Sequence, residues 1–360
     1  MTVISMSTEK PNNRHIAYID TLRIIAILLV CLIHSPILYL GTAYEHPFMA
    51  AYETVVGGAN IFLMISGSLL LPVKKPWREF VSRRLHVVGW PLLFWTVVYM
   101  AVGFATGSKT WSDVLMLPLM PADHTLWFVY QIIMVYLTLP VASICIKAAG
   151  KRGVQIYLLL WALSSLIPYQ HGVINAMAAQ QHPLSFFHNC YGYVILGYYL
   201  RHNPLPLFTL RHGWWITLIM LFGIVGVPLF EFNMQPDLTW RDHIVAITDH
   251  VSINSVMMST LVFTTVQHFC PEHYSEPETG GARFWRTLGK CTFGIYLMHI
   301  LMLEQLCVPL FNMIYQTLHP SFIVWILCIT VGMAAVAFII SAVVTRLILL
   351  LPFSRLIVGR

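Results

Sequence analysis

The chain has 360 residues, of which 58% are apolar and only 10% are charged. This balance excludes a soluble globular domain, in which about a quarter of the residues are charged. A formal net charge of +6 could suggest a nucleic-acid ligand, but the basic residues lie between long apolar runs. We therefore expect a membrane protein without a nucleic-acid partner.

Ten apolar stretches are long enough to cross a bilayer as helices, which takes about 17–25 residues each. They cover residues 18–40, 55–72, 85–106, 125–146, 154–170, 185–200, 213–230, 244–268, 288–310 and 322–346. The first stretch lacks a small-residue cleavage site and is interpreted as a retained anchor. The sequence predicts an all-α, polytopic bundle of about ten transmembrane helices over 18–346, with tails at 1–17 and 347–360.

The basic residues between the spans predict the orientation of the bundle. One alternating set of segments, together with both tails, holds eighteen Lys and Arg residues, whereas the opposite set holds only Lys109 and Arg241. Cytoplasmic segments carry the excess of Lys and Arg in membrane proteins. Both termini are therefore expected in the cytoplasm, and the opposite segments are too short to fold as separate domains.

The seven cysteines lie singly, mostly within apolar runs, and none forms a CxxC pair. Neither a disulfide framework nor a zinc site is indicated. We expect no metal, and we interpret most of these cysteines as small buried apolar residues.

The first span contains Arg23 and His34, eleven residues apart. Eleven residues make about three helical turns, so both side chains share one face, separated by roughly 16 Å along the axis. Ionisable groups inside a membrane are costly and usually functional. Asp20 lies one turn before Arg23 and would either neutralise it or reach towards the headgroups. His34 could alternatively be a hydrogen-bonded packing residue.

Further ionisable groups are embedded in the later spans. Asp249 and His250 lie on the eighth, and His299 and Glu304 on the ninth. Converging at the depth of His34, these groups would form a polar cavity with a tunable base. Structural pairing between helices is an equal alternative for each of them.

Arg83 and Arg84 end the densest basic cluster, at the mouth of the third span. Topology and anionic lipid explain most of this cluster, but two guanidinium groups could also hold phosphates. The chain has no Walker loop, GxGxxG, HExxH or GxSxG motif, so nucleotide hydrolysis and serine-hydrolase chemistry have no support.

Five short motifs follow one another along the chain. They are Arg23 and His34 with ten residues between them, Phe62 to Leu70 with Ser66-Gly67, Arg83-Arg84, Leu126-Trp127-Phe128 with Tyr136 and Pro140, and Phe293 to His299. In this order they resemble the motifs of the acyltransferase-3 family of multispanning membrane proteins. The chain is most similar to the stand-alone surface-polysaccharide O-acetyltransferases of the enterobacterial common antigen type. It departs from the family at Leu85 to Val88, where members often carry a further Arg and this chain has His86.

The resemblance implies a bacterial inner-membrane enzyme. Such an enzyme takes an acyl group, usually acetyl, from cytoplasmic acyl-CoA and places it on a hydroxyl of a periplasmic or lipid-linked surface glycan. The family residues that match Arg23 and His34 are tied to activity. No permanently bound cofactor is implied, because acetyl-CoA is a substrate, and self-association is left open.

We hypothesise that His34 is the general base for the sugar hydroxyl, with a transient acyl carrier as the alternative. Arg23 would orient the donor, while Arg83 and Arg84 would bind its phosphates. Further candidates for the acceptor site are Trp127, Tyr130, Tyr296, His299, Asp249 and Glu304. For the aromatic residues, anchoring at the membrane interface is an equal alternative.

Two other functions compete with this hypothesis. A transporter or exporter of a polysaccharide precursor or small acid also places charges inside the membrane, but the two halves lack a recurring pair of broken helices. A non-catalytic partner of a polysaccharide synthase could hold lipid-linked sugar in the bundle. Consumption of acyl-CoA distinguishes the acyltransferase from a transporter, which should leave the thioester intact. The non-catalytic partner predicts that His34→Gln leaves the glycan chemistry unchanged.

Overall fold

A computed structural model describes residues 15–39, 57–166, 183–219, 250–274, 279–318 and 323–359. These residues form helices and their connections, with no strand among them, which confirms the predicted all-α class. The α-helices are α1 (Ala17–His34), α3 (Gly58–Leu70), α4 (Trp77–Thr106), α5 (Trp111–Met116), α6 (Trp127–Ser164), α8 (Tyr191–His202), α11 (Ile253–Phe269), α12 (Gly280–Met302), α13 (Val308–Leu318), α14 (Ile323–Ile348) and α15 (Ser354–Val358). Residues 207–219 are also helical. Short 3₁₀ turns lie at η1 (Ser35–Tyr39), η2 (His124–Leu126) and η3 (Pro183–Phe187), and a π-turn, η5, at Leu303–Cys307.

The described helices have the length and surface of membrane spans. Five helical stretches are long and apolar enough to cross a bilayer: Ala17–His34, Trp77–Thr106, His124–Ser164, Gly280–Thr317 and Ile329–Ile348. Large apolar side chains remain exposed along their flanks, such as Val97, Ile144 and Ile339. A soluble monomer rarely exposes so much apolar surface. The fold is therefore that of a membrane-embedded helical protein.

Each of the ten predicted spans contains helix where the structure describes it, but several boundaries differ. Spans 125–146 and 154–170 are two arms of α6, which turns at Gly150 with φ of 62°. Glycine adopts this left-handed conformation without steric cost, so one residue makes the reversal. α4 starts at Trp77 and α12 at Gly280, each eight residues before the expected start of the span. Both helices thus extend beyond the apolar run, with basic residues in their first turns.

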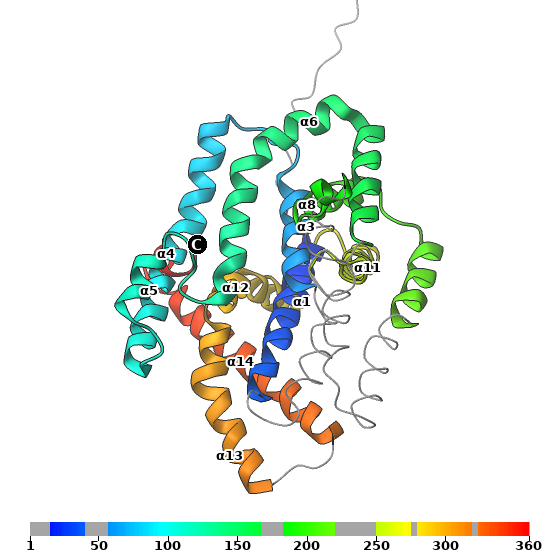
Figure 1. Ribbon diagram of the computed structural model, residues 1–360. Coiled ribbons are helices and arrows are strands. Elements are labelled where there is room, and N and C mark those ends of the chain that lie inside the picture. The colour runs from blue at the N-terminus through cyan, green and yellow to red at the C-terminus, as the bar shows by residue number, and fades with distance from the viewer. Residues whose placement is uncertain are drawn as a thin grey trace, which may run out of the picture.

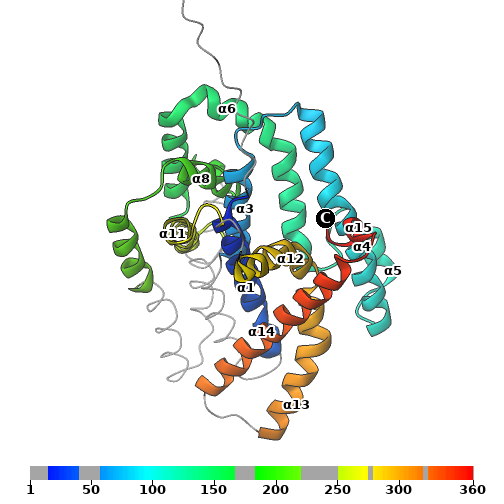
Figure 2. The ribbon, with the colours of Figure 1, turned by 180° about the vertical axis from the view of Figure 1, so that it is seen from behind.

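α1 is the central helix of the bundle. It packs against α3, α12 and α14 (Figures 1 and 2). Leu22, Ala26 and Ile27 on this helix are fully buried. Any residue on α1 is therefore held in place by neighbouring helices on several sides.

α3 and α8 cross with their backbones in close approach. A Cβ atom on Gly67 would lie 1.8 Å from the carbonyl oxygen of Val194, and one on Gly197 would lie 2.0 Å from that of Met64. Small residues allow such contacts, which contribute much of helix association where no hydrophobic effect acts between lipid-covered helices. The close packing of α3 against α8 therefore explains why the second residue of the Ser66-Gly67 pair is a glycine.

We predict that Gly67→Ala destabilises the protein by about 1–3 kcal/mol, because the backbone of Val194 cannot move aside as a flexible side chain could. Gly89→Ala is the matched control, since a Cβ atom there meets nothing within 4 Å. Thermal unfolding in detergent measures both. Gly67→Ala should lower Tm and Gly89→Ala should leave it unchanged or raise it; equal Tm values would show that this crossing is not tight.

Candidate active site

α1 carries two of the predicted site residues on one uninterrupted helix. From Arg23 to His34 the helical rise gives about 16 Å. His34 is the last residue of the α-helix because Pro36 has no N–H to continue the ladder. The Ser35 hydroxyl donates to the Leu32 carbonyl at 2.6 Å and closes this end of the helix. The separation of the two side chains is therefore fixed by a rigid element.

A cavity of about 440 Å³ runs beside α1. Its wall includes Arg84 and Lys290, which both contact solvent, and the buried Tyr296 and Phe128. Arg23 belongs to the same wall. We call the part around Arg84 and Lys290 the mouth and the apolar remainder the shaft. The remaining walls are mostly apolar and are formed by Phe62, Ile65, Ser66, Leu69, Leu70, Val87, Val88, Val129, Ile132, Tyr136, Thr292, Phe293, Val358 and Gly359. The cavity thus combines a cationic mouth with an apolar shaft.

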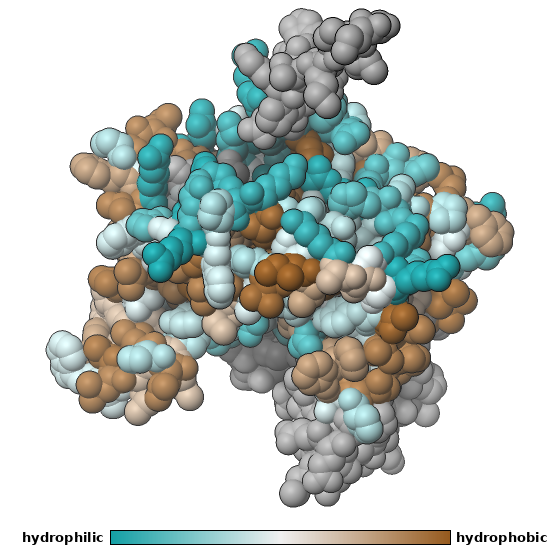
Figure 3. Space-filling view, turned by 90° about the horizontal axis from the view of Figure 1, so that it is seen from above, coloured by the Kyte–Doolittle hydropathy of each residue, from teal (hydrophilic) through white to brown (hydrophobic). Residues whose placement is uncertain are grey.

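α4, which carries Arg84, begins at the polar end of the molecule (Figure 1). Figure 3 shows hydrophilic side chains gathered across the end that is uppermost in Figure 1, where α3 connects to α4 and α6 turns. This is the end that the distribution of basic residues predicts to be cytoplasmic.

Arg84 is directed towards the cavity by aromatic rings. Its guanidinium carbon lies 5.8 Å from the ring centre of Phe80 and 5.9 Å from that of Tyr136. Contacts of this kind attract a cation to the ring face. Arg83 is exposed and does not line the cavity, because consecutive residues on a helix point about 100° apart. The structure therefore separates two residues that the sequence placed in one role.

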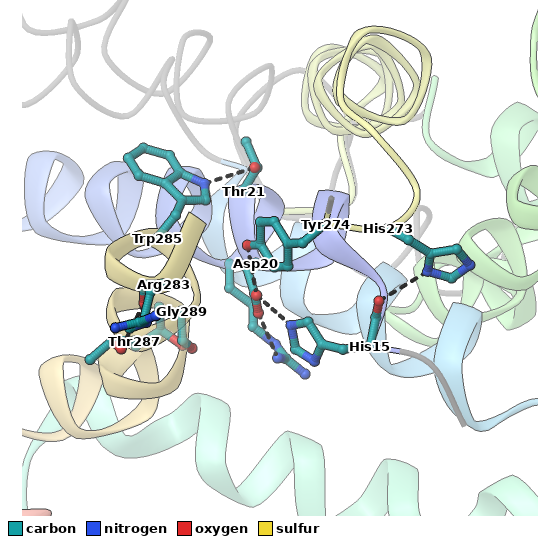
Figure 4. Close-up of polar contacts among 11 residues, drawn as sticks. His15, Asp20, Thr21, His273, Tyr274, Arg283, Trp285, Thr287 and Gly289 are labelled. Carbon is teal, nitrogen blue, oxygen red and sulfur yellow. Dashed lines mark hydrogen bonds and ion pairs between the residues drawn. The ribbon is translucent and has the colours of Figure 1, made fainter. Parts of the chain in front are cut away.

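A buried carboxylate anchors Arg23 at the polar end of α1 (Figure 4). Asp20 is fully buried and accepts hydrogen bonds from His15 Nε2 at 2.5 Å and from the Tyr274 hydroxyl at 3.0 Å. Arg23 Nη1 lies 3.5 Å from its other oxygen. A buried charge needs such partners to offset its lost hydration. Asp20 therefore does not extend to the headgroups but holds Arg23 inside the bundle.

The start of α1 is tied to the segment that precedes α12. His273 Nδ1 donates to the His15 carbonyl at 3.1 Å, and the Ala17 amide donates to the Glu272 carbonyl at 2.8 Å. Trp285 Nε1 donates to the Thr21 hydroxyl at 2.9 Å (Figure 4). The surroundings of Asp20 are thus built from segments far apart in sequence.

At the opposite end of α1, three histidines meet. The ring centre of His34 lies 5.2 Å from that of His299 and 6.0 Å from that of His124. The Tyr296 hydroxyl donates to the Thr125 carbonyl and so joins α12 to the start of α6. His34 faces this protein interior and not the lipid. Tyr296 lines the cavity and its ring centre lies 5.8 Å from that of His299, so the shaft ends beside the histidines.

Trp127 and His250 form a second aromatic pair, with ring centres 4.8 Å apart. The His250 carbonyl accepts hydrogen bonds from Asn60 Nδ2 at 3.0 Å and from the Tyr193 hydroxyl at 2.6 Å. α3 and α8 thereby fix the backbone of His250, and their tight crossing at Gly67 supports this position. Trp127 is half-buried.

The other predicted residues differ in their relation to this site. Tyr130 is half-buried against the core, and Glu304 lies half-buried in the π-turn η5. Asp249 lies outside the described residues. No group of three His, Cys, Asp or Glu side chains among the described residues could hold a metal ion.

Several site residues were not singled out from the sequence. In the sequence, Lys290 is one of the eighteen basic residues that predict the topology, and His124 lies just before the fourth predicted span. The predicted tail 347–360 contains α15, which places Val358 and Gly359 in the cavity wall. Trp95 Nε1 donates to the Ile357 carbonyl at 2.9 Å and holds this segment against α4. Only tertiary structure brings these residues to the cavity.

Comparison with known proteins gives the family of the chain. The family model Acyl_transf_3, described as an acyltransferase domain, matches residues 16–342. No curated protein and no solved structure was found to match the chain significantly. The matched region contains Arg23, the histidine cluster and nearly all of the cavity wall. The chain therefore belongs to the acyltransferase-3 family and is a membrane acyltransferase.

Proposed function

We propose that the protein transfers an acyl group, acetyl in the simplest case, from cytoplasmic acyl-CoA to a hydroxyl of a surface glycan. The acceptor is periplasmic or lipid-linked, and the enzyme lies in the inner membrane of a bacterium. The single observation that carries this proposal is one cavity whose wall unites Arg84, Lys290 and Arg23 with Tyr296, the neighbour of His299.

The cavity suits acyl-CoA because its two ends differ in chemistry. Arg84 and Lys290 can bind the donor's phosphates, since charge-assisted hydrogen bonds to phosphate are strong and guanidinium matches the geometry well. The apolar shaft suits the flexible arm that carries the thioester and keeps water from it. Arg83, which is exposed, contributes positive potential near the mouth and no direct contact.

Arg23 orients the thioester arm within the shaft. Its guanidinium is anchored by Asp20 and faces the cavity together with Arg84. The charge of Arg23 is partly balanced, so the side chain can offer hydrogen bonds to the donor without attracting bulk water. The distance of about 16 Å along α1 is one that an extended pantetheine arm can cover.

His34 removes the proton of the acceptor hydroxyl as its oxygen bonds to the acyl carbon. The resulting tetrahedral intermediate collapses when the carbon–sulfur bond breaks, and the departing sulfur takes the proton from His34. The products are the acylated glycan and free CoA. Trp127 offers an aromatic face for a sugar ring, and the exposed His124 lies beside His34 towards the opposite end from the donor mouth.

We predict that His34→Ala lowers transfer from labelled acetyl-CoA to extracted surface glycan by about 10²–10⁴-fold, because the general base is lost. His86→Ala is the control, since His86 is exposed on α4 and lies outside the cavity. Label incorporation into glycan by purified protein measures both. Wild-type transfer by His34→Ala would remove the general-base role, and an intact thioester with wild-type protein would favour a transporter.

We predict that Arg84→Gln and Arg83→Gln differ in CoA binding although each removes one charge from the same surface. Arg84→Gln should weaken CoA binding by about tenfold or more, in keeping with a lost charge-assisted hydrogen bond. Arg83→Gln should weaken it less than about threefold, as is typical of an exposed charge. Titration calorimetry at two salt concentrations measures the difference. Equal effects would mean that phosphates bind to the surface and not at the cavity mouth.

We predict that Asp20→Asn lowers kcat/KM for acetyl-CoA by about tenfold or more, because an amide no longer balances the charge of Arg23. The control is Glu79→Gln, which removes an exposed carboxylate that pairs with Lys75 on the same side of the protein. Steady-state kinetics with varied acetyl-CoA gives the comparison. Unchanged kinetics in Asp20→Asn would show that Arg23 needs no anchor.

A further inference from the structure

The surroundings of His299 fix the position of its hydrogen. This side chain is fully buried on α12, and its Nδ1 lies 2.6 Å from the Tyr296 carbonyl oxygen. A carbonyl oxygen only accepts hydrogen bonds, so Nδ1 must be the donor. In the neutral ring the lone pair is then on Nε2.

That lone pair is buried without a partner. Among the described residues, Nε2 of His299 has no hydrogen-bond donor within reach. An unsatisfied buried acceptor costs about 1–3 kcal/mol and calls for an explanation. Nδ1 faces the backbone of its own helix, so Nε2 lies on the opposite edge of the ring. The neighbouring imidazole of His34 has its ring centre 5.2 Å away.

We propose that His299 is a positioning residue for His34, with Nε2 of His299 accepting a hydrogen bond from one ring N–H of His34. This inference rests on the proposed function, in which His34 is the base. A chain of hydrogen bonds then runs from the Tyr296 carbonyl through both imidazoles to the acceptor hydroxyl. The free nitrogen of His34, on the far edge of its ring, carries the lone pair that meets the hydroxyl.

This arrangement follows the logic of a nucleophile, a base and an orienting group. The orienting group selects the tautomer of the base and stabilises the cation that forms. Here the proton of the hydroxyl moves to His34 as the new carbon–oxygen bond forms, and the positive charge is shared with His299. The proton leaves with the sulfur when the carbon–sulfur bond breaks, so both rings return to their starting state.

A neutral hydrogen-bond acceptor, such as Nε2 of His299, suits this buried position. Asp123 lies 3.7 Å from His124 Nδ1, and Glu304 lies on η5; neither is within hydrogen-bonding distance of His34 in the structure. A neutral partner leaves His34 uncharged and basic at rest. The two rings form no hydrogen bond in this structure, and catalytic hydrogen bonds in substrate-free sites are often long and tighten when substrates bind.

The test compares His299→Phe, His299→Gln and the control Tyr99→Phe. Phe keeps a ring without a lone pair, and Gln places an acceptor oxygen near the position of Nε2. Tyr99→Phe removes the 3.0 Å hydrogen bond from the Tyr99 hydroxyl to the Leu297 carbonyl and reports any loosening of α12. Each variant is assayed with labelled acetyl-CoA and extracted surface glycan.

We expect His299→Phe to lower kcat about 100-fold, with KM for acetyl-CoA changed less than about threefold. His299→Gln should regain about tenfold of that loss, and Tyr99→Phe should match the wild type. Equal loss in the Phe and Gln variants, or wild-type kcat in His299→Phe, would overturn the proposal.

Nitrogen NMR of histidine-labelled protein tests the geometry without any assay. We expect His299 as the Nδ1–H tautomer, and the His34 signals should shift in His299→Phe but not in Tyr99→Phe. A protonated Nε2 on His299 in the neutral protein would overturn the pairing, whether or not the variants fold. If the wild type transfers no acyl group, the proposed function fails, while these spectra still decide whether the two histidines are paired.

Discussion

A single uninterrupted helix sets the distance between a guanidinium at the polar edge of the bundle and an imidazole at the far end of that helix. α1 is uninterrupted from Ala17 to His34 and is packed on several sides. Its two functional side chains cannot approach each other, so a reaction that uses both must bring the substrate along the helix. The cavity beside α1 provides that path. The rest of the site is arranged around this fixed separation.

The two ends of α1 differ in their electrostatic surroundings, as suits two substrates of different charge. At the polar end, Asp20 compensates Arg23 while Arg84 and Lys290 stay available at the cavity mouth. At the other end, the imidazole of His299 is fully buried in the interior, where a permanent charge would be costly. In the proposed reaction, an anionic donor is drawn to one end, and proton transfer takes place at the other. Tyr296 lies between the two regions, lining the cavity and touching the histidine cluster.

Elements and the central motif could be predicted from sequence, because apolar length and helical spacing are local properties. The shared face of Arg23 and His34 follows from the helical period alone.

Lys290 and Gly359 could not be assigned to the cavity from the sequence, because they reach it only when α12 and α15 pack against α4. Arg83 and Arg84 have different environments because α4 starts at Trp77, before the apolar run, and both residues are therefore helical. The apolar run alone does not predict this earlier start. The partners of Asp20 come from residues 15 and 274, and no spacing rule connects them. Asp249, predicted for the acceptor side, lies outside the described residues.

The close crossing of α3 and α8 shows how packing far from the chemistry supports it. Gly67 belongs to a segment that resembles a motif of the family, yet its own role is to admit a neighbouring backbone. Through that crossing, Asn60 and Tyr193 reach the carbonyl of His250 and place it against Trp127. Family motifs in this chain therefore mix residues that shape the site with residues that face it.

The central claim is that the donor lies in the cavity beside α1, with its acyl end near His34. Cryo-electron microscopy of the protein with a non-hydrolysable thioether analogue of acetyl-CoA tests it most directly. The account predicts density for the phosphates at Arg84 and Lys290 and density for the arm past Arg23 to Tyr296. Density in a different cavity, such as the apolar one between α6 and α8 that Cys145, Tyr157 and Tyr191 line, would contradict this prediction if the α1 cavity were empty.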